Sequence, residues 1–327
     1  MQQPMRVSVI MPMDRPGADA RKAVASVLSQ ETSIPFELIV VSAADPGLAD
    51  DPRLRIVLLD ERNPAIRRNA AAAVAAGEIL AFIDDDAFAA PSWIDSGVSW
   101  LDAHPEVVAV GGPDPAPDDS TLPELISDTL LSTRWIGSGI VAHESRPGVF
   151  PVRKPWDLAL VNLFVRASAF KELRGFDESI GYIGEDTDLL RRIASLGVVQ
   201  YHHGIVVHHR RRAFPRAYIR QRWRYRLKTG QRIVRGGSEY RTPAVAALLG
   251  GGVFFLAVLL VAPPLAAALL LVYALASFAL AIPSTRLPVL LWPVIPVAFL
   301  VHHSTYFLGI VSGMILGLAG DREREMP

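Results

Sequence analysis

The sequence predicts an α/β protein in which a doubly wound, mostly parallel sheet is followed by a C-terminal region of transmembrane helices. Three observations predict this class. Short apolar runs alternate with amphipathic helical segments through the first half of the 327 residues. One such run ends in three consecutive acids, Asp84, Asp85 and Asp86. From residue 244 onward the chain is nearly free of charge as far as residue 320.

Apolar periodicity places alternating strands and helices in the first part of the chain. Asn63 and Pro64 mark the start of the second helix and Gly77 its end, because these residues favour an N-cap, a first helical turn and a helix stop. In a β-α-β-α-β order the strands lie parallel, and ligands bind beyond their carboxyl ends. The expected strands span residues 6–11, 36–41, 54–59 and 79–83, and the expected helices span 18–29 and 65–76.

The next part of the chain is less regular. A further strand at 107–110 leads into residues 111–156, which are rich in proline and glycine and hold one expected helix at 122–133. Irregular segments of this length are usually functional or disordered, and we expect part of this one to lie over an acceptor. An amphipathic helix then spans 185–196, and a short apolar run at 206–208 follows.

Asp84, Asp85 and Asp86 stand at the point where a parallel strand ends. Adjacent carboxylates repel one another and gain proton affinity unless a cation lies among them. Oxygen ligands at such a position suit Mg²⁺ or Mn²⁺ held together with a substrate diphosphate. The alternative interpretation is a solvated acidic turn after a strand.

A second acidic cluster opens the helix at 185–196, in the segment GEDTD at residues 184–188. Acids stabilise the positive end of a helix, so an ordinary helix start is the alternative interpretation. Two acidic clusters in one α/β domain also suit a metal-dependent transfer reaction. One cluster would hold the cation, and the other would remove a proton.

Three apolar segments in the last third are long enough to cross a membrane of roughly 30 Å hydrocarbon thickness. They are separated by Pro263-Pro264, which would form a tight hairpin, and by a proline-rich stretch. The third segment is too long for one ordinary span, so we interpret it as one crossing preceded by a broken or re-entrant piece. Buried helices of a soluble protein are the alternative. The segments span 244–262, 264–282 and 288–319.

Although the net charge is zero, residues 210–241 form a basic block that contains eleven arginines and one lysine but only one acid, Glu239. Because the block precedes the first span, the positive-inside tendency predicts a cytoplasmic N-terminal domain. The block should also attract anionic membrane lipids. Nucleic-acid binding is the competing explanation, but the adjacent membrane region already accounts for the charge, and we expect no nucleic acid partner. We also expect no signal peptide, and the absence of cysteine excludes disulfides.

The order and spacing of several short motifs resemble those of one family. The matching segments are VSVIMP at 7–12, AVASVLSQ at 23–30, FELIVV at 36–41, RN at 68–69, AGEI at 76–79, the aspartate triplet, PSW at 91–93, GFDE at 175–178 and GEDTDL at 184–189. Together they resemble a membrane-anchored glycosyltransferase of family 2 with a GT-A fold. The apolar C-terminal region is similar to that of bacterial enzymes that extend lipid-linked exopolysaccharide intermediates, including succinoglycan-type enzymes.

The resemblance implies a role for each acidic cluster. Asp84 and Asp86 match the D-x-D pair, with Asp86 the direct metal ligand and Asp84 nearer the ribose or metal. Asp186 matches the catalytic base, which would take the proton of an acceptor hydroxyl, and Glu185 matches its companion. Attack opposite the diphosphate would invert the configuration at the anomeric carbon. A metal would stabilise the charge on the leaving diphosphate.

Further residues follow from the same resemblance. Pro12, Arg68 and Asp85 match donor-binding positions, although an exposed helix arginine is an alternative for Arg68. The family commonly has an aspartate pair after the second strand, where this chain has Ser42-Ala43, so Asp45 could bind the nucleotide base only through a rearranged loop.

A histidine near the metal or diphosphate is also expected. Among His202, His203, His208 and His209, the resemblance favours His208 as the ligand, with a plain surface cluster as the alternative. Gln221, Arg222 and Trp223 resemble a segment that lies near the diphosphate or acceptor, although the full Q-x-x-R-W pattern is absent. An interfacial helix is the alternative for them.

We therefore expect an inverting, Mg²⁺- or Mn²⁺-dependent glycosyltransferase that moves a sugar from a nucleotide-diphosphate donor to a lipid-linked saccharide acceptor. Its location would be the bacterial inner membrane, as a multi-pass protein with a cytoplasmic catalytic domain. The alternatives are a polyprenyl-phosphate glycosyltransferase and a catalytically inactive, membrane-tethered binding protein on the same fold. The expected domains are a GT-A catalytic domain at 1–209, a basic amphipathic segment at 210–243 and the membrane region at 244–320.

Overall fold

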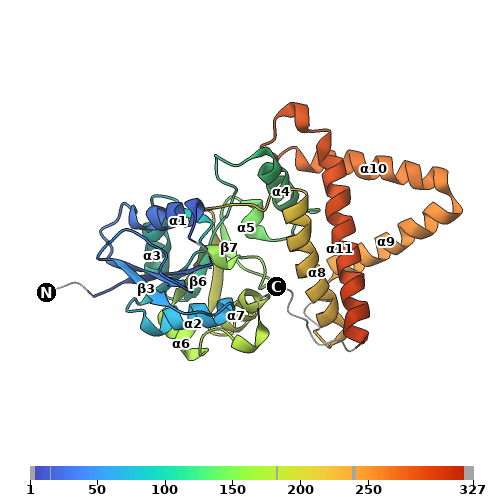
Figure 1. Cartoon of the computed structure of the whole chain (residues 1–327). Helices are drawn as coiled ribbons and strands as arrows, with labels where there is room; N and C mark the ends of the chain where they lie inside the picture. The colour runs from blue at the N-terminus through green and yellow to red at the C-terminus, as the bar shows by residue number, and fades with distance from the viewer. Residues whose placement is uncertain (1–3, 15, 182, 238–240, 320–327) are drawn as a thin grey trace. The chain divides into compact units, whose positions relative to one another are not determined.

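The computed structural model of the chain describes residues 4–14, 16–181, 183–237 and 241–319 (Figure 1). It divides into two compact units, which are treated separately below. The sheet unit comprises Met1–Asp119 and Gly139–Arg210, and the helical unit comprises Ser120–Ser138 and Arg211–Pro327. The domain boundaries expected from the sequence stay predictions, and their outer ends at residues 1 and 320 lie outside the described residues.

An eight-stranded sheet with the order β3-β2-β1-β4-β8-β6-β9-β7 forms the centre of the sheet unit. Strands β1 to β4 are parallel to one another, and β6 is parallel to β9, whereas β8 and β7 run antiparallel to their neighbours. The predicted α/β class with a mostly parallel sheet is confirmed. The strands are β1 Val7–Met13, β2 Phe36–Ser42, β3 Leu54–Leu58, β4 Ile79–Phe82, β6 Val107–Gly111, β7 Val149–Pro151, β8 Leu163–Arg166 and β9 Val198–His202.

Helices cover both faces of this sheet because the central strands are apolar on both sides. Val9 and Met11 belong to one buried cluster, with residues of α1 and α3, whereas Ile10 between them belongs to the other, with residues of α2, α6 and α7. This alternation is the period of two that a strand imposes. The helices of the unit are α1 Ala18–Leu28, α2 Pro64–Val74, α3 Trp93–Ala103, α5 Val141–Glu144, α6 Ala167–Glu172 and α7 Glu185–Ile193.

Helix α2 illustrates how the sequence sets local structure. The side chain of Asn63 accepts a hydrogen bond from the backbone N–H of Ala65 at 3.0 Å, and Pro64 is the first helical residue, as predicted. The helix ends at Val74, earlier than expected, because Ala75 has an extended backbone with ψ of 135°. Gly77 lies closely against Ser8, where a side chain would collide with the backbone of β1.

The carboxyl ends of β1, β4 and β6 lie at one edge of the sheet, because these three strands point the same way. A second, two-stranded ribbon follows there, formed by β5 (Ala87–Ala89) and β10 (Val207–His209) in antiparallel register. Polar residues that follow these strands are therefore brought to one place.

Within its described residues, the helical unit contains three helices that are long and apolar enough to cross a membrane. They correspond to the predicted apolar segments, and the third is preceded by a separate short turn of 3₁₀-helix at Val289–Leu291, in the proline-rich stretch. The helices of the unit are α4 Leu122–Ser132, α8 Arg216–Val234, α9 Pro243–Val261, α10 Pro263–Ala281 and α11 Val294–Leu318.

Candidate functional site

The β5–β10 ribbon brings a histidine to the aspartate triplet. The triplet follows β4 and leads directly into β5, and in the ribbon His209 lies opposite Ala87. The backbone N–H of Arg210 donates to the carbonyl oxygen of Asp86 at 2.9 Å, which extends the pairing by one residue. Two segments far apart in the chain thus meet at the carboxyl end of the sheet.

Asp84, Asp86 and His209 form a group that could hold a metal ion. One ligand atom from each lies within 4.8 Å of the others, and Nε2 of His209 is 3.3 Å from Oδ1 of Asp86. Two carboxylates and an imidazole form a chemically suitable donor set for a divalent ion that prefers oxygen but accepts nitrogen. The residues present therefore fit a divalent metal.

The histidine in this group is His209, whereas the sequence suggested His208. Adjacent residues of a strand point to opposite faces, so only one of the two rings can face Asp86. Nδ1 of His208 is instead buried, with no hydrogen-bond partner among the described residues. The histidine that lies beside Asp84 and Asp86 is thus His209, and the role of a histidine as metal ligand stays a prediction.

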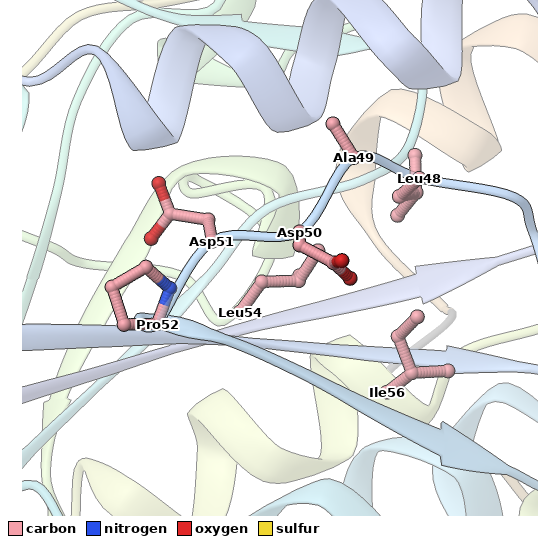
Figure 2. Close-up of a pocket in the computed structure, with 7 residues that line it drawn as sticks. All are labelled: Leu48, Ala49, Asp50, Asp51, Pro52, Leu54 and Ile56. Carbon is pink, nitrogen blue, oxygen red and sulfur yellow. The ribbon is translucent and has the colours of Figure 1, made fainter.

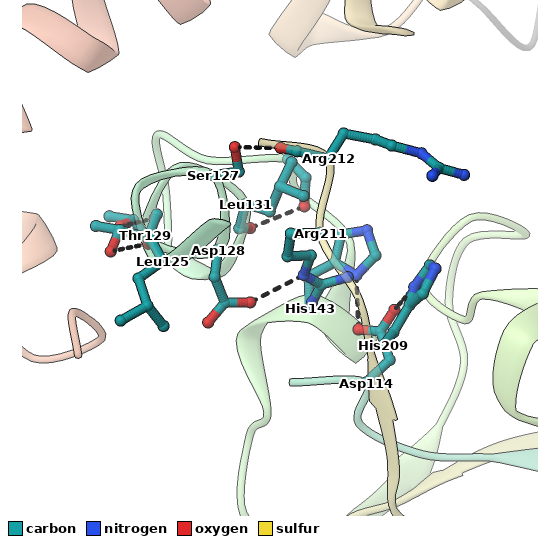
Figure 3. Close-up of polar contacts among 12 residues, drawn as sticks. Asp114, Leu125, Ser127, Asp128, Thr129, Leu131, His143, His209, Arg211 and Arg212 are labelled. Atoms are coloured by element: carbon teal, nitrogen blue, oxygen red, sulfur yellow. Dashed lines mark hydrogen bonds and ion pairs between the residues drawn. The ribbon is translucent and has the colours of Figure 1, made fainter. Parts of the chain in front are cut away.

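Asp114 and His143 support His209 from the other side (Figure 3). Nδ1 of His209 lies 3.4 Å from Oδ2 of Asp114, and Nδ1 of His143 lies 2.7 Å from Oδ1 of the same carboxylate. Asp114 is completely buried. A carboxylate behind the second nitrogen of an imidazole fixes the orientation of the ring and raises its basicity as a metal ligand. Sequence reasoning missed both residues, although Asp114 follows β6 much as the triplet follows β4.

Arg68 of α2 connects the two acidic clusters. Its Nη2 donates to Oδ1 of Asp84 at 3.0 Å, and its Nη1 donates to Oε1 of Glu185 at 3.0 Å. The side chain is buried, with 8% exposed, so the alternative of an exposed helix arginine is excluded. Both acids therefore share one cation in a place where unpaired charges would be costly.

The start of α7 places Glu185 and Asp186 in different surroundings. Burial raises the pKa of Glu185 to about 7, the neighbouring Asp186 adds to the effect, and Arg68 opposes it. Asp186 is half-buried, accepts a hydrogen bond from the backbone N–H of Thr187 at 2.7 Å, and has no ion pair among the described residues. Asp188, by contrast, pairs with two arginines of its own helix. Of the three acids, Asp186 is thus the one that forms no ion pair within the part of the chain that the structure describes.

Asp85 and Pro12 lie beside the end of β1. Oδ2 of Asp85 accepts a hydrogen bond from the backbone N–H of Asp14 at 2.9 Å. Burial raises the pKa of Asp85 to about 7, with Asp86 contributing by charge repulsion. Pro12 is half-buried near the end of strand β1, two residues before Asp14. Their roles at the donor stay predictions.

The loop after β2 gives no comparable site. Asp45 is exposed, and its Oδ1 accepts a hydrogen bond from the backbone N–H of Gly47 at 2.9 Å, which closes a local turn. A shallow pocket lies farther along the same connection, and its lining does not include Asp45 (Figure 2). Asp45 at the nucleotide base therefore stays a prediction. The pocket is lined by Leu48, Ala49, Asp50, Asp51, Pro52, Leu54 and Ile56.

Gln221, Arg222 and Trp223 belong to α8 in the helical unit. Nη2 of Arg222 donates to Oε1 of Gln221 at 3.0 Å. Trp223 lines an open surface with exposed arginines of the same helix. The geometry of the sheet unit does not include these residues, and their role at the acceptor or diphosphate stays a prediction.

Two family models match the chain. The model described as glycosyl transferase family 2 matches residues 8–148, and that described as glycosyl transferase family group 2 matches residues 79–309. Among curated proteins, glucosyl-dolichyl phosphate glucuronosyltransferase of Haloferax volcanii is 37% identical over 102 residues. That match covers 28% of this chain and 32% of the relative, so the chain spans about a third of the relative's length.

Two solved structures are similar along almost the whole chain. The crystal structure of S. aureus TarS 1-349 has 14% sequence identity and a TM-score of 0.49, with 98% of this chain and 93% of that one covered. The mannosyltransferase PcManGT from Pyrobaculum calidifontis, in complex with GDP-Man and Mn²⁺, has 18% identity and a TM-score of 0.49, with 98% and 77% covered. Neither likeness is strong enough to assign a substrate or a metal to this chain.

Proposed function

Because this chain belongs to glycosyl transferase family group 2, we propose that it transfers a sugar from a nucleotide-diphosphate donor to a lipid-linked saccharide, with inversion at the anomeric carbon. The observation that carries the proposal is the shared cation Arg68, which links the aspartate triplet to the start of α7. The two acidic clusters are thereby parts of one site, as a reaction between a bound donor and an activated acceptor requires.

Asp84, Asp86 and His209 would hold a divalent ion, Mg²⁺ or Mn²⁺, beside the diphosphate of the donor. Carboxylate oxygens suit either ion, whereas the imidazole favours Mn²⁺, since Mg²⁺ is bound almost entirely by oxygen. When bound, the ion would supply positive charge to the leaving diphosphate.

The protein's own residues would supply proton transfer, positioning of the two acidic clusters and donor binding. Asp186 accepts the proton of the acceptor hydroxyl, since its carboxylate is not neutralised by an ion pair. Arg68 holds Glu185 and Asp84 in fixed positions, so that α7 and the triplet keep their spacing when the donor binds. Pro12 near the end of β1 and Asp85 after β4 would contact the donor.

A lipid-borne saccharide is the proposed acceptor. The three apolar helices would keep the enzyme at the membrane that carries such a lipid. The name of the Haloferax relative also describes a glycosylated lipid phosphate as its substrate, although the match covers a third of that protein. Arginines at 210–241 favour a cytoplasmic catalytic unit in a multi-pass protein of the bacterial inner membrane, with a role in cell-surface polysaccharide synthesis.

The experiment is a screen of nucleotide sugars for release of free nucleoside diphosphate by the detergent-solubilised full chain, with Mg²⁺, with Mn²⁺ and with chelator. We expect release with one class of donor and only with metal, and a loss of at least about 100-fold in Asp86→Ala. Equal release by Asp86→Ala and the parent would contradict the metal site. Asp186→Asn should abolish transfer to a saccharide hydroxyl, whereas transfer to a lipid phosphate, which needs little base catalysis, would be spared.

A further inference from the structure

In the helical unit, the basic helix α8 packs directly along α11, one of the three apolar helices. Glycines make this contact close. A Cβ added at Gly313 would collide with the carbonyl oxygen of Leu227, and one added at Gly230 would collide with that of Ile310. Small residues that let two helix backbones approach in this way are typical of helix pairs in membranes. α8 is therefore held against a candidate membrane span.

Two arginines of α8 lie at this contact, Arg226 against a ring of α11 and Arg222 against a ring of α8. The guanidinium carbon of Arg226 lies 3.8 Å from the centre of the Tyr306 ring. Arg222, one helical turn earlier, lies 5.5 Å from the centre of the Tyr218 ring, and the hydroxyl of Tyr218 is hydrogen-bonded to Nδ1 of His302. His302 and Tyr306 are neighbours on α11, with ring centres 4.1 Å apart. Two cations and a group of polar rings thus share one place.

Among the described residues, no carboxylate pairs with either of these two arginines. The Nε atoms of both are buried without a hydrogen-bond partner in the part of the chain that the structure describes. The sequence has no Asp or Glu from residue 242 to residue 320. The acids of residues 120–138 are engaged elsewhere, as Asp128 accepts from Nε of Arg211 at 2.9 Å (Figure 3) and Glu124 caps α4.

Two neighbouring cations without an anion are costly to desolvate, and more so at a membrane helix. Guanidinium groups bind phosphate well because their planar array of donors matches its oxygens. Nε2 of His302 is a third buried polar atom here without a hydrogen-bond partner among the described residues. Arg222 and Arg226 are half-buried, so the group keeps a path to its surroundings.

We propose that Arg222 and Arg226, together with His302 and Tyr306, bind the phosphate or diphosphate of the lipid that carries the acceptor. This inference rests on the proposed function, because a lipid-borne acceptor supplies the anion. The inference adds to that function the residues that recognise the lipid, at the contact of α8 with α11, and the chemical group that they bind, a phosphate or diphosphate. The lipid tail would remain in the membrane beside α11, which is apolar elsewhere.

The test measures binding of a polyprenyl phosphate to the full chain in detergent, without nucleotide sugar or metal, so that it does not depend on catalysis. We expect the double variant Arg222→Gln/Arg226→Gln to bind at least about tenfold more weakly than the parent. The matched control is Arg220→Gln/Arg224→Gln, which removes the same charge at the same spacing from the exposed side of α8. This control should bind within about twofold of the parent.

Two competitors distinguish the source of the phosphate. Inorganic pyrophosphate should displace the polyprenyl phosphate from the parent, whereas phosphatidylglycerol at equal concentration should not. Unchanged binding by the Arg222/Arg226 variant, an equal loss in the control, or equal displacement by phosphatidylglycerol would each overturn the inference. If the double variant does not fold, the single variants Arg222→Gln and Arg226→Gln decide, each with an expected loss of about threefold or more. Absence of nucleoside diphosphate release by the parent would count against the proposed function alone.

Discussion

Nε2 of His209 lies 3.3 Å from Oδ1 of Asp86, in the group that also contains Asp84. We expect His209→Asn to weaken Mn²⁺ binding by at least about tenfold, because the imidazole would be one of three protein ligands. Calorimetric titration of the full chain with Mn²⁺ measures this. His208→Asn is the matched control and should bind Mn²⁺ like the parent. If His208→Asn instead weakens Mn²⁺ binding and His209→Asn does not, His208 is the ligand, as the sequence suggested.

Asp114 is expected to act on metal affinity through His209. Asp114→Asn keeps the size of the side chain but removes the charge behind Nδ1 of His209, and loss of such a partner typically weakens a metal site about 10- to 100-fold. The Mn²⁺ affinity and the electron paramagnetic resonance signal of bound Mn²⁺ should both change. Asp102→Asn, an exposed acid of α3 paired with Arg6, serves as the control and should change neither. Identical titrations of parent and Asp114→Asn would refute this role.

The raised pKa of Glu185 predicts that the stability of the folded protein depends on pH. This pKa is raised by burial from an ordinary value of 4.5 to about 7, with Asp186 adding to the shift and Arg68 opposing it. A carboxyl with a higher pKa in the folded state binds protons on folding. Its stabilising contribution is therefore complete below about pH 4.5 and is lost as the pH rises through about 7, a change of roughly 3 kcal/mol.

The measurement is the melting temperature of the metal-free protein between about pH 5 and pH 8. The melting temperature of the parent should fall with rising pH more steeply than that of Glu185→Gln, which cannot ionise. Glu172→Gln, at an exposed position of α6, should keep the slope of the parent. Parallel curves for parent and Glu185→Gln would show that this carboxyl does not titrate in the range.

The close approach of Gly313 to Leu227 predicts that a larger side chain at residue 313 weakens the packing of α8 on α11. Gly313→Val would force α8 and α11 apart, since even a Cβ at this position collides with the Leu227 carbonyl. Overpacking of this kind costs about 1–3 kcal/mol or more, and we expect a lower melting temperature in detergent. Gly251→Val on α9 is the matched control, because no other group lies within 4 Å of a Cβ there. Equal melting of the two variants would argue against the close helix contact.

The sequence by itself determined the fold class and most elements that carry the first acidic cluster. Apolar runs with a period of two and helices with caps such as Asn63 are local signals, so β1 to β4 and α2 follow from the residues. The three apolar helices follow from composition and length alone. The aspartate triplet could be placed because a parallel strand delivers its next residues to the ligand-binding edge.

Tertiary structure decided which distant residues join that triplet. Strand β8 lies antiparallel between β4 and β6, and no local signal in its four residues indicates that position. The choice between His208 and His209 depends on which face of β10 meets β5, a matter of register that the sequence of one strand leaves open. The burial of Arg68 between Asp84 and Glu185, and of Asp114 behind His209, likewise arises only when separate segments pack together. Local sequence patterns therefore determine the strands and helices, whereas the packing of distant segments determines which charged side chains pair with one another.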